Sequence, residues 1–268
     1  MGRKHRKRVT KAERQEMTFF RDSWIIFTRA MRLSLRQPMW VLIGLLQPIL
    51  YLVLFGPLLQ TVAKTSGFIG DAWQVFVPGL LVQLGIFGGL FVGFGIIAEW
   101  RSGVIDRQLV TPAARAAIIC GRTLRDVVVI TVQAMVLCCC AYFMGLRVPP
   151  GAFLIGLVLV ALLGAAFSFI SNAIGLATKS EDALAPMVNT LALPILLLSG
   201  ILLPMNIAPQ WLQIVSDFNP FKHIVEALRA VFRSDFTNPI VWIGALLAVV
   251  LVVLGAWVGS RTLAAQTR

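Results

Sequence analysis

The sequence predicts an all-α membrane protein with six transmembrane helices, an N-terminal amphipathic interfacial helix and short outer helices. Composition is one reason: 58% of the 268 residues are hydrophobic and 13% are charged, whereas a soluble domain carries about 25% charged residues. Six apolar stretches are a second reason, because each is close to the roughly 20 residues that a bilayer-spanning helix needs. The third is an uneven distribution of Lys and Arg along the chain. Lipid is therefore the expected solvent for most of the surface.

The N-terminal arm divides into two segments. Residues 1–16 predict a disordered tail, and we interpret its basic run "GRKHRKR" as a topology anchor near anionic lipid rather than a nucleic-acid patch. Residues 17–37 predict an amphipathic helix, because Phe20, Trp24 and Leu35 belong to one apolar face at helical spacing while arginines gather on another side. Such a helix would lie in the inner membrane interface. A soluble helix packed on a partner is the alternative.

Residues 38–268 predict a single membrane domain with six spans. Two spans carry small or polar residues at intervals of four, which favours close helix packing over a substrate path. The predicted spans cover residues 40–60, 73–98, 127–146, 152–177, 184–204 and 240–260. The residues at intervals of four are Gly85, Gly89 and Gly93 in the second span, and Gly164, Ser168 and Asn172 in the fourth.

The basic residues predict the orientation. With the N-terminus inside, the inner segments hold 19 of the 24 Lys and Arg residues, and eleven of these lie in residues 1–37. The outer segments hold the other five. Because short cytoplasmic loops are enriched in Lys and Arg, we place both termini in the cytoplasm of a multi-pass protein of the plasma membrane, which we expect to be bacterial.

One outer segment is more than a loop. Residues 209–218 and 220–233 each begin at a proline suited to a first helical turn. Both pieces are partly apolar, but they are too short and too charged to cross a bilayer. We expect them to dip into the outer leaflet or to lie on it.

Several kinds of chemistry are absent from the sequence. It contains no GxSxG, HExxH or GxxxxGK[ST] motif, so we expect no catalytic residue, no metal site and no cofactor in this chain. The predicted spans hold no Asp, Glu, Lys, Arg or His between their ends, which argues against a proton-driven transporter. The four cysteines lie in or beside predicted spans, and we interpret them as small apolar packing residues. Energy for any transport must then come from another polypeptide.

A charged segment interrupts the apolar chain. The run "EWRSGVIDRQLVTPAARAAIICGRTLRD", from Glu99 to Asp126, holds eight charged residues and connects the second and third spans on the predicted inner side. Its first part can form a short helix, and Thr111-Pro112 can begin another. From the residues alone, contact with a soluble partner and a solvated loop are equally good interpretations.

Three segments in this order carry a family resemblance. They are "PMWVLIGLLQPILYLVLFGP", "EWRSGVIDRQLVTPAARAAIICGR" and "LALPILLLSGILLPMNIAPQWLQIVSDFNPFKHIVEALR". Together they resemble type-2 ABC transporter permeases, nearest to the daunorubicin and multidrug resistance exporters, over roughly residues 19–262. The resemblance implies a transport subunit without its own ATP site. A second permease copy or a homologous permease would pair with it, and two separate ATPase subunits that bind ATP and Mg would dock underneath.

The resemblance also implies roles for residues. A coupling helix at about 99–111 would contact the ATPase, helped by the connecting helix in the N-terminal arm. The outer pieces would be re-entrant helices at an exit gate, where Glu226 and Arg229 could pair. The implied coupling positions are Glu99, Arg101, Gly103, Asp106, Arg107, Leu109 and Pro112. The implied gate positions are Trp211, Asn219, Pro220, Glu226 and Arg229.

The expected function is export of an amphipathic drug, antibiotic or lipid-like cargo, driven by ATP. One alternative is a glycolipid or polysaccharide exporter of the same superfamily. Another is a six-span membrane enzyme or assembly factor outside it. Polar residues within spans are the candidates for a cargo cavity. They are Gln83, Asn172, Asn189, Thr190 and Ser199.

Overall fold

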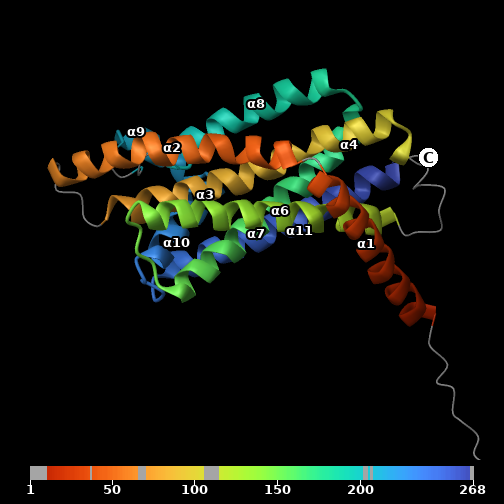
Figure 1. Ribbon diagram of the computed structural model, residues 1–268, viewed down its shortest axis with the longest axis horizontal. Helices are drawn as coiled ribbons and strands as arrows, with labels where there is room; N and C mark the ends of the chain where they lie inside the picture. The colour runs from red at the N-terminus through yellow and green to blue at the C-terminus, as the bar shows by residue number, and fades with distance from the viewer. Residues whose placement is uncertain are drawn as a thin grey trace, which may run out of the picture.

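The protein is a bundle of long, nearly parallel helices with one helix crossing its end (Figure 1). The computed structural model describes residues 11–36, 38–65, 71–105, 115–201, 205 and 208–265. Those residues form ten helices and no strand. The helices are α1 (Lys11–Arg36), α2 (Pro38–Thr65), α3 (Ala72–Leu90), α4 (Val92–Arg101), α6 (Arg115–Phe143), α7 (Pro150–Thr178), α8 (Glu181–Leu198), α9 (Gln210–Asp217), α10 (Pro220–Phe232) and α11 (Pro239–Ala265).

Six segments of the described chain are long and apolar enough to cross a membrane, which confirms the predicted fold class. α3 and α4 together make the second segment. The segments are Val41–Gln60, Ala72–Arg101, Ala117–Phe143, Pro150–Thr178, Glu181–Leu198 and Pro239–Thr262.

The third segment corrects the sequence prediction. It begins at Ala117 rather than at residue 127, so Arg122, Arg125 and Asp126 lie inside a candidate span. The expectation that no span contains a charged residue between its ends is therefore wrong. A hydropathy pattern stops at charged residues, whereas a helix continues through them when neighbouring helices supply polar partners.

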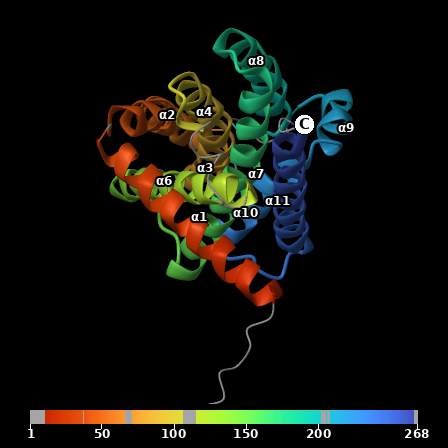
Figure 2. The same cartoon turned by 90° about the vertical axis from the view of Figure 1, so that its right-hand side faces the viewer.

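Helix α1 also begins earlier than predicted. It starts at Lys11 rather than at residue 17, because the intervening "KAERQE" contains good helix formers and no Gly or Pro. The helix crosses the bundle at the end where the C-terminal part of α11 lies, and it packs mainly on α6 (Figures 1 and 2).

Small residues let α7 lie close to the second span. A Cβ added at Gly89 would lie 2.6 Å from the Phe167 Cβ, and one added at Gly93 would lie 2.7 Å from the Ser171 carbonyl oxygen. Real side chains do not approach so closely, so only glycine fits. The predicted packing role of this glycine stripe is confirmed.

The second span is interrupted where it meets α7. α3 ends at Leu90 and α4 begins at Val92, with Phe91 between them. The Ser171 hydroxyl accepts a hydrogen bond from the Gly93 backbone N–H at 2.9 Å and donates one to the Leu90 carbonyl. A side chain of α7 thus satisfies backbone groups at the interruption, as a break within a membrane requires.

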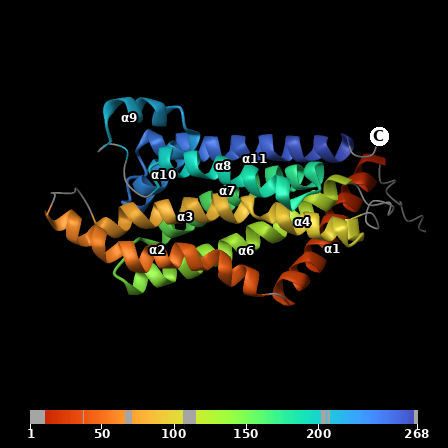
Figure 3. The ribbon, with the colours of Figure 1, turned by 90° about the horizontal axis from the view of Figure 1, so that it is seen from above.

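The two short helices α9 and α10 differ from each other. α10 is packed between α3, α7 and α11, and Ile224, Val225 and Leu228 are fully buried. α9 instead exposes apolar side chains, including Trp211 and Phe218, and lies at the edge of the bundle (Figure 3). α10 thus belongs to the core of the bundle, whereas the expectation that both pieces dip into the outer leaflet or lie on it stays a prediction.

Candidate functional site

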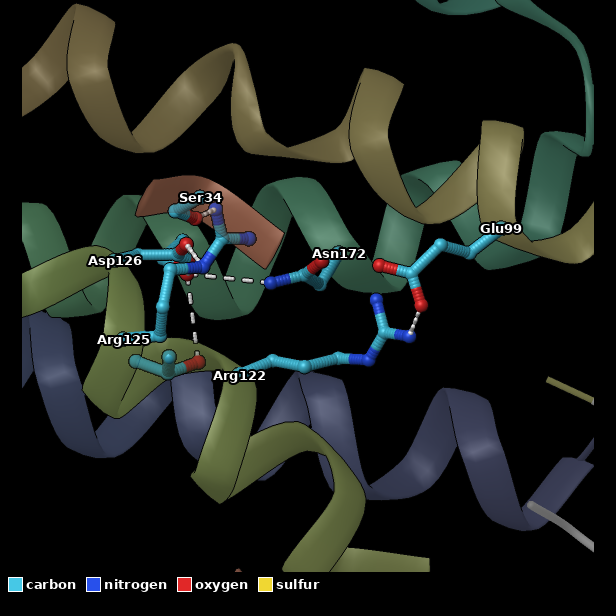
Figure 4. Close-up of polar contacts among 8 residues, drawn as sticks. Ser34, Glu99, Arg122, Arg125, Asp126 and Asn172 are labelled. Atoms are coloured by element: carbon cyan, nitrogen blue, oxygen red, sulfur yellow. Dashed lines mark hydrogen bonds and ion pairs between the residues drawn. The ribbon is translucent and has the colours of Figure 1, made fainter. Parts of the chain in front are cut away.

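Charged and polar side chains from four helices meet near the end of the bundle that α1 crosses (Figure 4). We call this group the inner polar cluster. Its members are Ser34 from α1, Glu99 from α4, Thr123 with Arg122, Arg125 and Asp126 from α6, and Ser168 with Asn172 from α7.

Asp126 lies at the centre of the cluster and its side chain is 1% exposed. One carboxylate oxygen is 2.8 Å from the Arg125 Nε. The other accepts a hydrogen bond from the Ser168 hydroxyl at 2.5 Å, and the Asn172 amide donates to the same hydroxyl at 3.2 Å. The carboxylate thus has both a cation and a hydrogen-bonding chain from α7, which a buried charge requires.

A second ion pair joins the two ends of the charged segment. Arg122, with a side chain only 4% exposed, donates to the Glu99 carboxylate, which is about one-third exposed at 32%. Glu99 is in the last turn of α4, whereas Arg122 is in the second turn of α6. The pair therefore holds the end of α4 against the start of α6, on either side of the connection between the second and third spans.

The cluster reaches α1 through Arg125. Its Nη1 donates to the Ser34 hydroxyl at 3.0 Å. One turn earlier on α6, a Cβ added at Gly121 would lie 2.6 Å from the Ser23 carbonyl oxygen of α1. The absence of a side chain at Gly121 lets α1 lie directly on α6, where Ser34 can reach the arginine.

Further contacts at the same end bring in α8. Arg101 Nη1 donates to Glu181 Oε1 at 3.1 Å, and both side chains are about half exposed. A small apolar core formed by Ile96, Ile105 and Ile119 with Leu176 lies beside these polar contacts. Ile105, which follows the turn after α4, is 2% exposed. Its side chain therefore packs the start of the connecting segment against α6 and α7.

The cluster consists of groups that form ion pairs and hydrogen bonds. It contains carboxylates, guanidinium groups, hydroxyls and an amide, but the described residues contain no group of three or more His, Cys, Asp or Glu residues that could hold a metal. Four buried atoms of the cluster make no hydrogen bond, although two of them lie within ion-pair distance of each other. They are Arg122 Nε, Asn172 Oδ1 and the ion-paired Arg125 Nε and Asp126 Oδ1. Buried ion pairs that keep unsatisfied atoms are costly to rearrange one group at a time, so the joined helix ends should move together.

The predicted coupling residues divide between the described and undescribed parts of the chain. Glu99 and Arg101 are at the end of α4 and bind Arg122 and Glu181 within this chain. Gly103 has a φ of 70° in the turn that follows, a conformation that favours glycine. Asp106, Arg107, Leu109 and Pro112 lie outside the described residues.

The five candidates for a cargo cavity are not brought together. Gln83 and Asn172 are buried in different helices, and Ser199 caps the end of α8, where its hydroxyl donates to the Leu196 carbonyl. Asn189 and Thr190 are exposed on α8. A cavity of about 160 Å³ between the second span, α7 and α8 is lined by none of the five, and its walls are apolar apart from Ser171.

The residues of the predicted outer gate lie on two different helices, α9 and α10, or at the start of α10. Trp211 is 66% exposed on α9. Asn219 accepts a hydrogen bond from the Phe221 backbone N–H at 3.0 Å and so caps α10, whose first residue is Pro220. Glu226 lies 3.9 Å from Lys222, and Arg229 turns away from it.

The Arg229 guanidinium group donates hydrogen bonds to backbone carbonyls rather than to a carboxylate. Its Nε donates to the Val75 carbonyl of α3 at 3.0 Å, and its Nη2 donates to the Gly200 carbonyl after α8 at 2.7 Å. Burial lowers the pKa of Arg229 to about 10, so the side chain stays charged at neutral pH. It ties α10 to the ends of two spans, and the suggested Glu226–Arg229 pair is replaced by this arrangement.

The sequence interpretation missed the polar cluster in the third and fourth spans. A signal was present: Arg122 and Asp126 are four residues apart, as are Ser168 and Asn172, so each pair lies on one helix face. The sequence pattern assigns the α7 residues to helix packing and the α6 residues to a cytoplasmic connection, so it separates side chains that the structure brings together.

A family comparison decides the class of protein. The model of the family described as "ABC-2 type transporter" matches residues 21–232, which includes α1 from residue 21 onward and all but the last of the spans.

The chain belongs to the ABC-2 type transporter family.

Related proteins agree with this membership of the ABC-2 family. The chain is 28% identical to the transport permease ycf38 of Cyanophora paradoxa, over 81% of this chain and 76% of the relative. It is 26% identical to the daunorubicin resistance ABC transporter permease DrrB1 of Streptomyces coeruleorubidus, over 77% of this chain and 73% of the relative. It is 23% identical to the doxorubicin resistance ABC transporter permease DrrC of Mycobacterium tuberculosis, over 82% and 81% respectively. The resemblance to ABC-2 permeases of the drug-resistance branch is confirmed.

Proposed function

We propose that this multi-pass membrane protein is the permease subunit of an ATP-driven exporter. Separate ATPase subunits would bind ATP and Mg and dock on the end of the bundle that carries α1. Family membership supports a permease, and two relatives are named as ABC transporter permeases. Export, rather than import, is inferred from the drug-resistance names of those relatives.

The inner polar cluster is the observation that carries this proposal. A partner that pushes on the segment after α4 must move the second and third spans together, because Glu99 binds Arg122. The same helix, α6, holds α7 through Asp126 and α1 through Arg125. A change in the ATPase can therefore reach four helices through one joint, provided that its contacts differ between two states.

This geometry refines the predicted coupling residues. Glu99 and Arg101 already have partners in this chain, so we assign them to the joint rather than to the ATPase surface. The direct contact would be made by the residues beyond the α4 turn, from Gly103 through Asp106, Arg107 and Leu109 to Pro112.

Pairing with a second permease is supported by α8. Only 17% of its membrane segment is buried, and the exposed residues include Asn189 and Thr190. Polar side chains exposed to lipid are unfavourable, and they usually face a bundle interior or a water-filled path. We propose that α8 faces a second copy, or a homologous permease, across the cargo path.

The cargo we propose is an amphipathic drug, antibiotic or lipid-like molecule. The names of DrrB1 and DrrC mention daunorubicin and doxorubicin resistance, and the apolar cavity beside α8 suits a hydrophobic molecule. A glycolipid or polysaccharide is the alternative cargo class within the same superfamily. The proposed location is the plasma membrane of a bacterium with both termini in the cytoplasm.

Reconstitution tests the proposal. Proteoliposomes containing this chain alone should not accumulate daunorubicin, used as the probe cargo, whereas addition of its ATPase with ATP and Mg should start accumulation. A charge reversal at Asp106 and Arg107 should abolish the gain, because like charges at a docking surface repel. The control is Thr262→Ser, which reverses no charge and changes a half-buried side chain outside the docking segment.

Two results would contradict the proposal. The first is uphill transport by the chain alone when only a proton gradient is supplied, which would make buried Asp126 part of a proton path. The second is unchanged coupling of ATP hydrolysis to transport in the variant with both charges reversed. If daunorubicin fails while a lipid-linked sugar is moved, the alternative cargo class is correct.

A further inference from the structure

The exposed side of α1 carries three arginines that no acidic side chain neutralises in the part of the chain that the structure describes. Arg29, Arg32 and Arg36 are all exposed. Among the side chains of α1 that the structure describes, those of residues 19–36, the one ion pair joins Arg21 to Asp22 at 3.8 Å. Their spacing of three and four residues brings the three guanidinium groups onto one helix face. A positive patch without internal counter-charges attracts anions.

The arginines border a shallow groove on the surface of α1. Its volume is about 330 Å³, and apart from the arginines it is lined by Ile25, Thr28 and Leu33. The groove therefore combines three cations and a hydroxyl with aliphatic side chains. A phosphate carrying a hydrocarbon chain matches both parts of this surface.

The order of side chains around α1 indicates what lies beside the arginines. One side of the helix packs on α6, with Ile26 near Gly121 and Ser34 bonded to Arg125. Next to it is an exposed apolar strip that includes Trp24 at 60% and Leu35 at 73%. The arginine face follows on the far side of that strip. Around the helix, the side that packs on α6 is followed by the apolar strip and then by the arginines. This order is expected of a helix that lies at a membrane surface beside a bundle.

The position of α1 places this face at the membrane entry. α1 ends at Arg36, and the first membrane helix α2 begins at Pro38. Figures 1 and 3 show α1 crossing the end of the bundle beside the start of α2. The arginine nearest this junction is Arg36, so the groove lies where lipid headgroups meet the first span.

We propose that the Arg29, Arg32 and Arg36 groove binds the phosphate headgroup of an anionic lipid, and that this lipid holds α1 on the inner polar cluster. The link is direct, because Ser34 lies between Arg32 and Arg36 in the chain and accepts the hydrogen bond from Arg125. A lipid that fixes this turn of α1 also fixes Arg125, which pairs with Asp126. The proposal concerns a lipid site and does not depend on the identity of the cargo or the ATPase.

The expected effect is large enough to measure. Each Arg near an anionic membrane surface contributes roughly fivefold in affinity, so three together contribute well over tenfold. The contribution weakens as salt screens the charges. Phosphatidylglycerol should therefore bind much more tightly than zwitterionic phosphatidylcholine.

Native mass spectrometry of the full chain in detergent provides the test. Short-chain phosphatidylglycerol should bind at least tenfold more tightly than phosphatidylcholine and than inorganic phosphate, which lacks the hydrocarbon chain. The triple variant R29Q/R32Q/R36Q should lose this preference. The matched control K64Q/R147Q/R233Q removes three positive charges at the opposite end of the bundle and should keep it. Thermal unfolding in detergent should be unchanged in R29Q/R32Q/R36Q, because the three side chains are exposed.

Three outcomes would overturn the proposal. The first is equal phosphatidylglycerol binding by the wild-type chain and R29Q/R32Q/R36Q. The second is full competition by inorganic phosphate, which would indicate a site for a soluble anion. The third is unchanged lipid binding with loss of ATPase association, which would assign the patch to a protein partner. If the triple variant does not fold, the single variant R32E gives the same comparison.

Discussion

At the scale of single residues, the inner polar cluster depends on charges that need one another. Arg122 is almost completely buried, and Glu99 is the carboxylate that neutralises it. Removal of one member of such a pair leaves an uncompensated charge in a medium that solvates it poorly. The cost should therefore greatly exceed that of losing an exposed ion pair.

We expect Glu99→Gln to lower the free energy of unfolding by about 1–3 kcal/mol, because it leaves buried Arg122 with only a neutral partner. The measurement is unfolding in detergent, followed by circular dichroism. Arg101→Gln is the control, since it breaks the more exposed Arg101–Glu181 pair and should cost less than about 1 kcal/mol. Equal costs for the two variants would contradict the importance of the buried pair.

Arg229 offers a second prediction at this scale. Arg229→Met keeps an unbranched stem but removes both donors to the Val75 and Gly200 carbonyls. We expect a loss of about 2–3 kcal/mol in the free energy of unfolding, because one buried and one part-buried acceptor lose charged donors. Arg233→Met, one turn along the same region and exposed, should change it by less than about 0.5 kcal/mol. Thermal unfolding of both variants decides the question, and a neutral Arg229→Met would refute it.

At the scale of elements, the glycine stripe in the second span has a specific requirement. Gly93 faces α7 so closely that an added Cβ would lie 2.6 Å from the Ser171 hydroxyl, the group that bridges the interruption at Phe91. Gly95, two residues later, has no atom within 4 Å of an added Cβ. The same helix therefore contains a position that excludes alanine and one that accepts it.

Gly93→Ala should lower the melting temperature in detergent by several degrees, because it forces α4 away from α7 and breaks the Ser171 bridge. Gly95→Ala should leave it unchanged or raise it slightly, since alanine favours helix over glycine by about 1 kcal/mol. Melting curves of the two variants provide the comparison. A melting temperature for Gly93→Ala equal to that of Gly95→Ala would show that the close contact is not needed.

The elements also show what sequence alone could predict. The spans were predictable because hydropathy is a local property that each stretch of chain displays by itself. The inner polar cluster was not, because Asp126 becomes tolerable in a span only when Arg125 and Ser168 are beside it. The burial of α10 was not predictable for a related reason. It depends on how α3, α7 and α11 are arranged around the helix, which the local sequence of α10 does not indicate.

At the scale of the whole molecule, the helix ends sort into two groups. The end with α1 carries the inner polar cluster, and the opposite end carries α9, α10 and the connection between α6 and α7 (Figure 1). The predicted orientation assigns the first group to the cytoplasm. Two of the 19 basic residues counted on the inner side, Arg122 and Arg125, belong to the cluster itself, but the other 17 still outnumber the five on the outer side.

Single cysteines test the orientation in a chain whose four native cysteines have been replaced. A cysteine at Arg147, between α6 and α7, or at Gly70 should react with a membrane-impermeant maleimide added to intact cells. A cysteine at Gly103 should react only after the membrane is permeabilised. Labelling of Gly103 in intact cells would reverse the orientation and remove the basis for docking an ATPase at that end.

The continuity of α6 has a consequence for the electrical behaviour of the protein. Asp126 is 17 residues before the end of α6 at Phe143, which corresponds to about 26 Å along a helix. The hydrocarbon core is about 30 Å thick. With Phe143 at the outer boundary, as the predicted orientation requires, the ion pairs of α6 would lie near the inner boundary, where little of the transmembrane voltage is felt. A charge that crosses the whole field gains about 2.3 kcal/mol per 100 mV, whereas these charges would cross only a small part of it. A potassium diffusion potential of either sign should therefore change the basal ATPase rate of the reconstituted complex by less than about twofold.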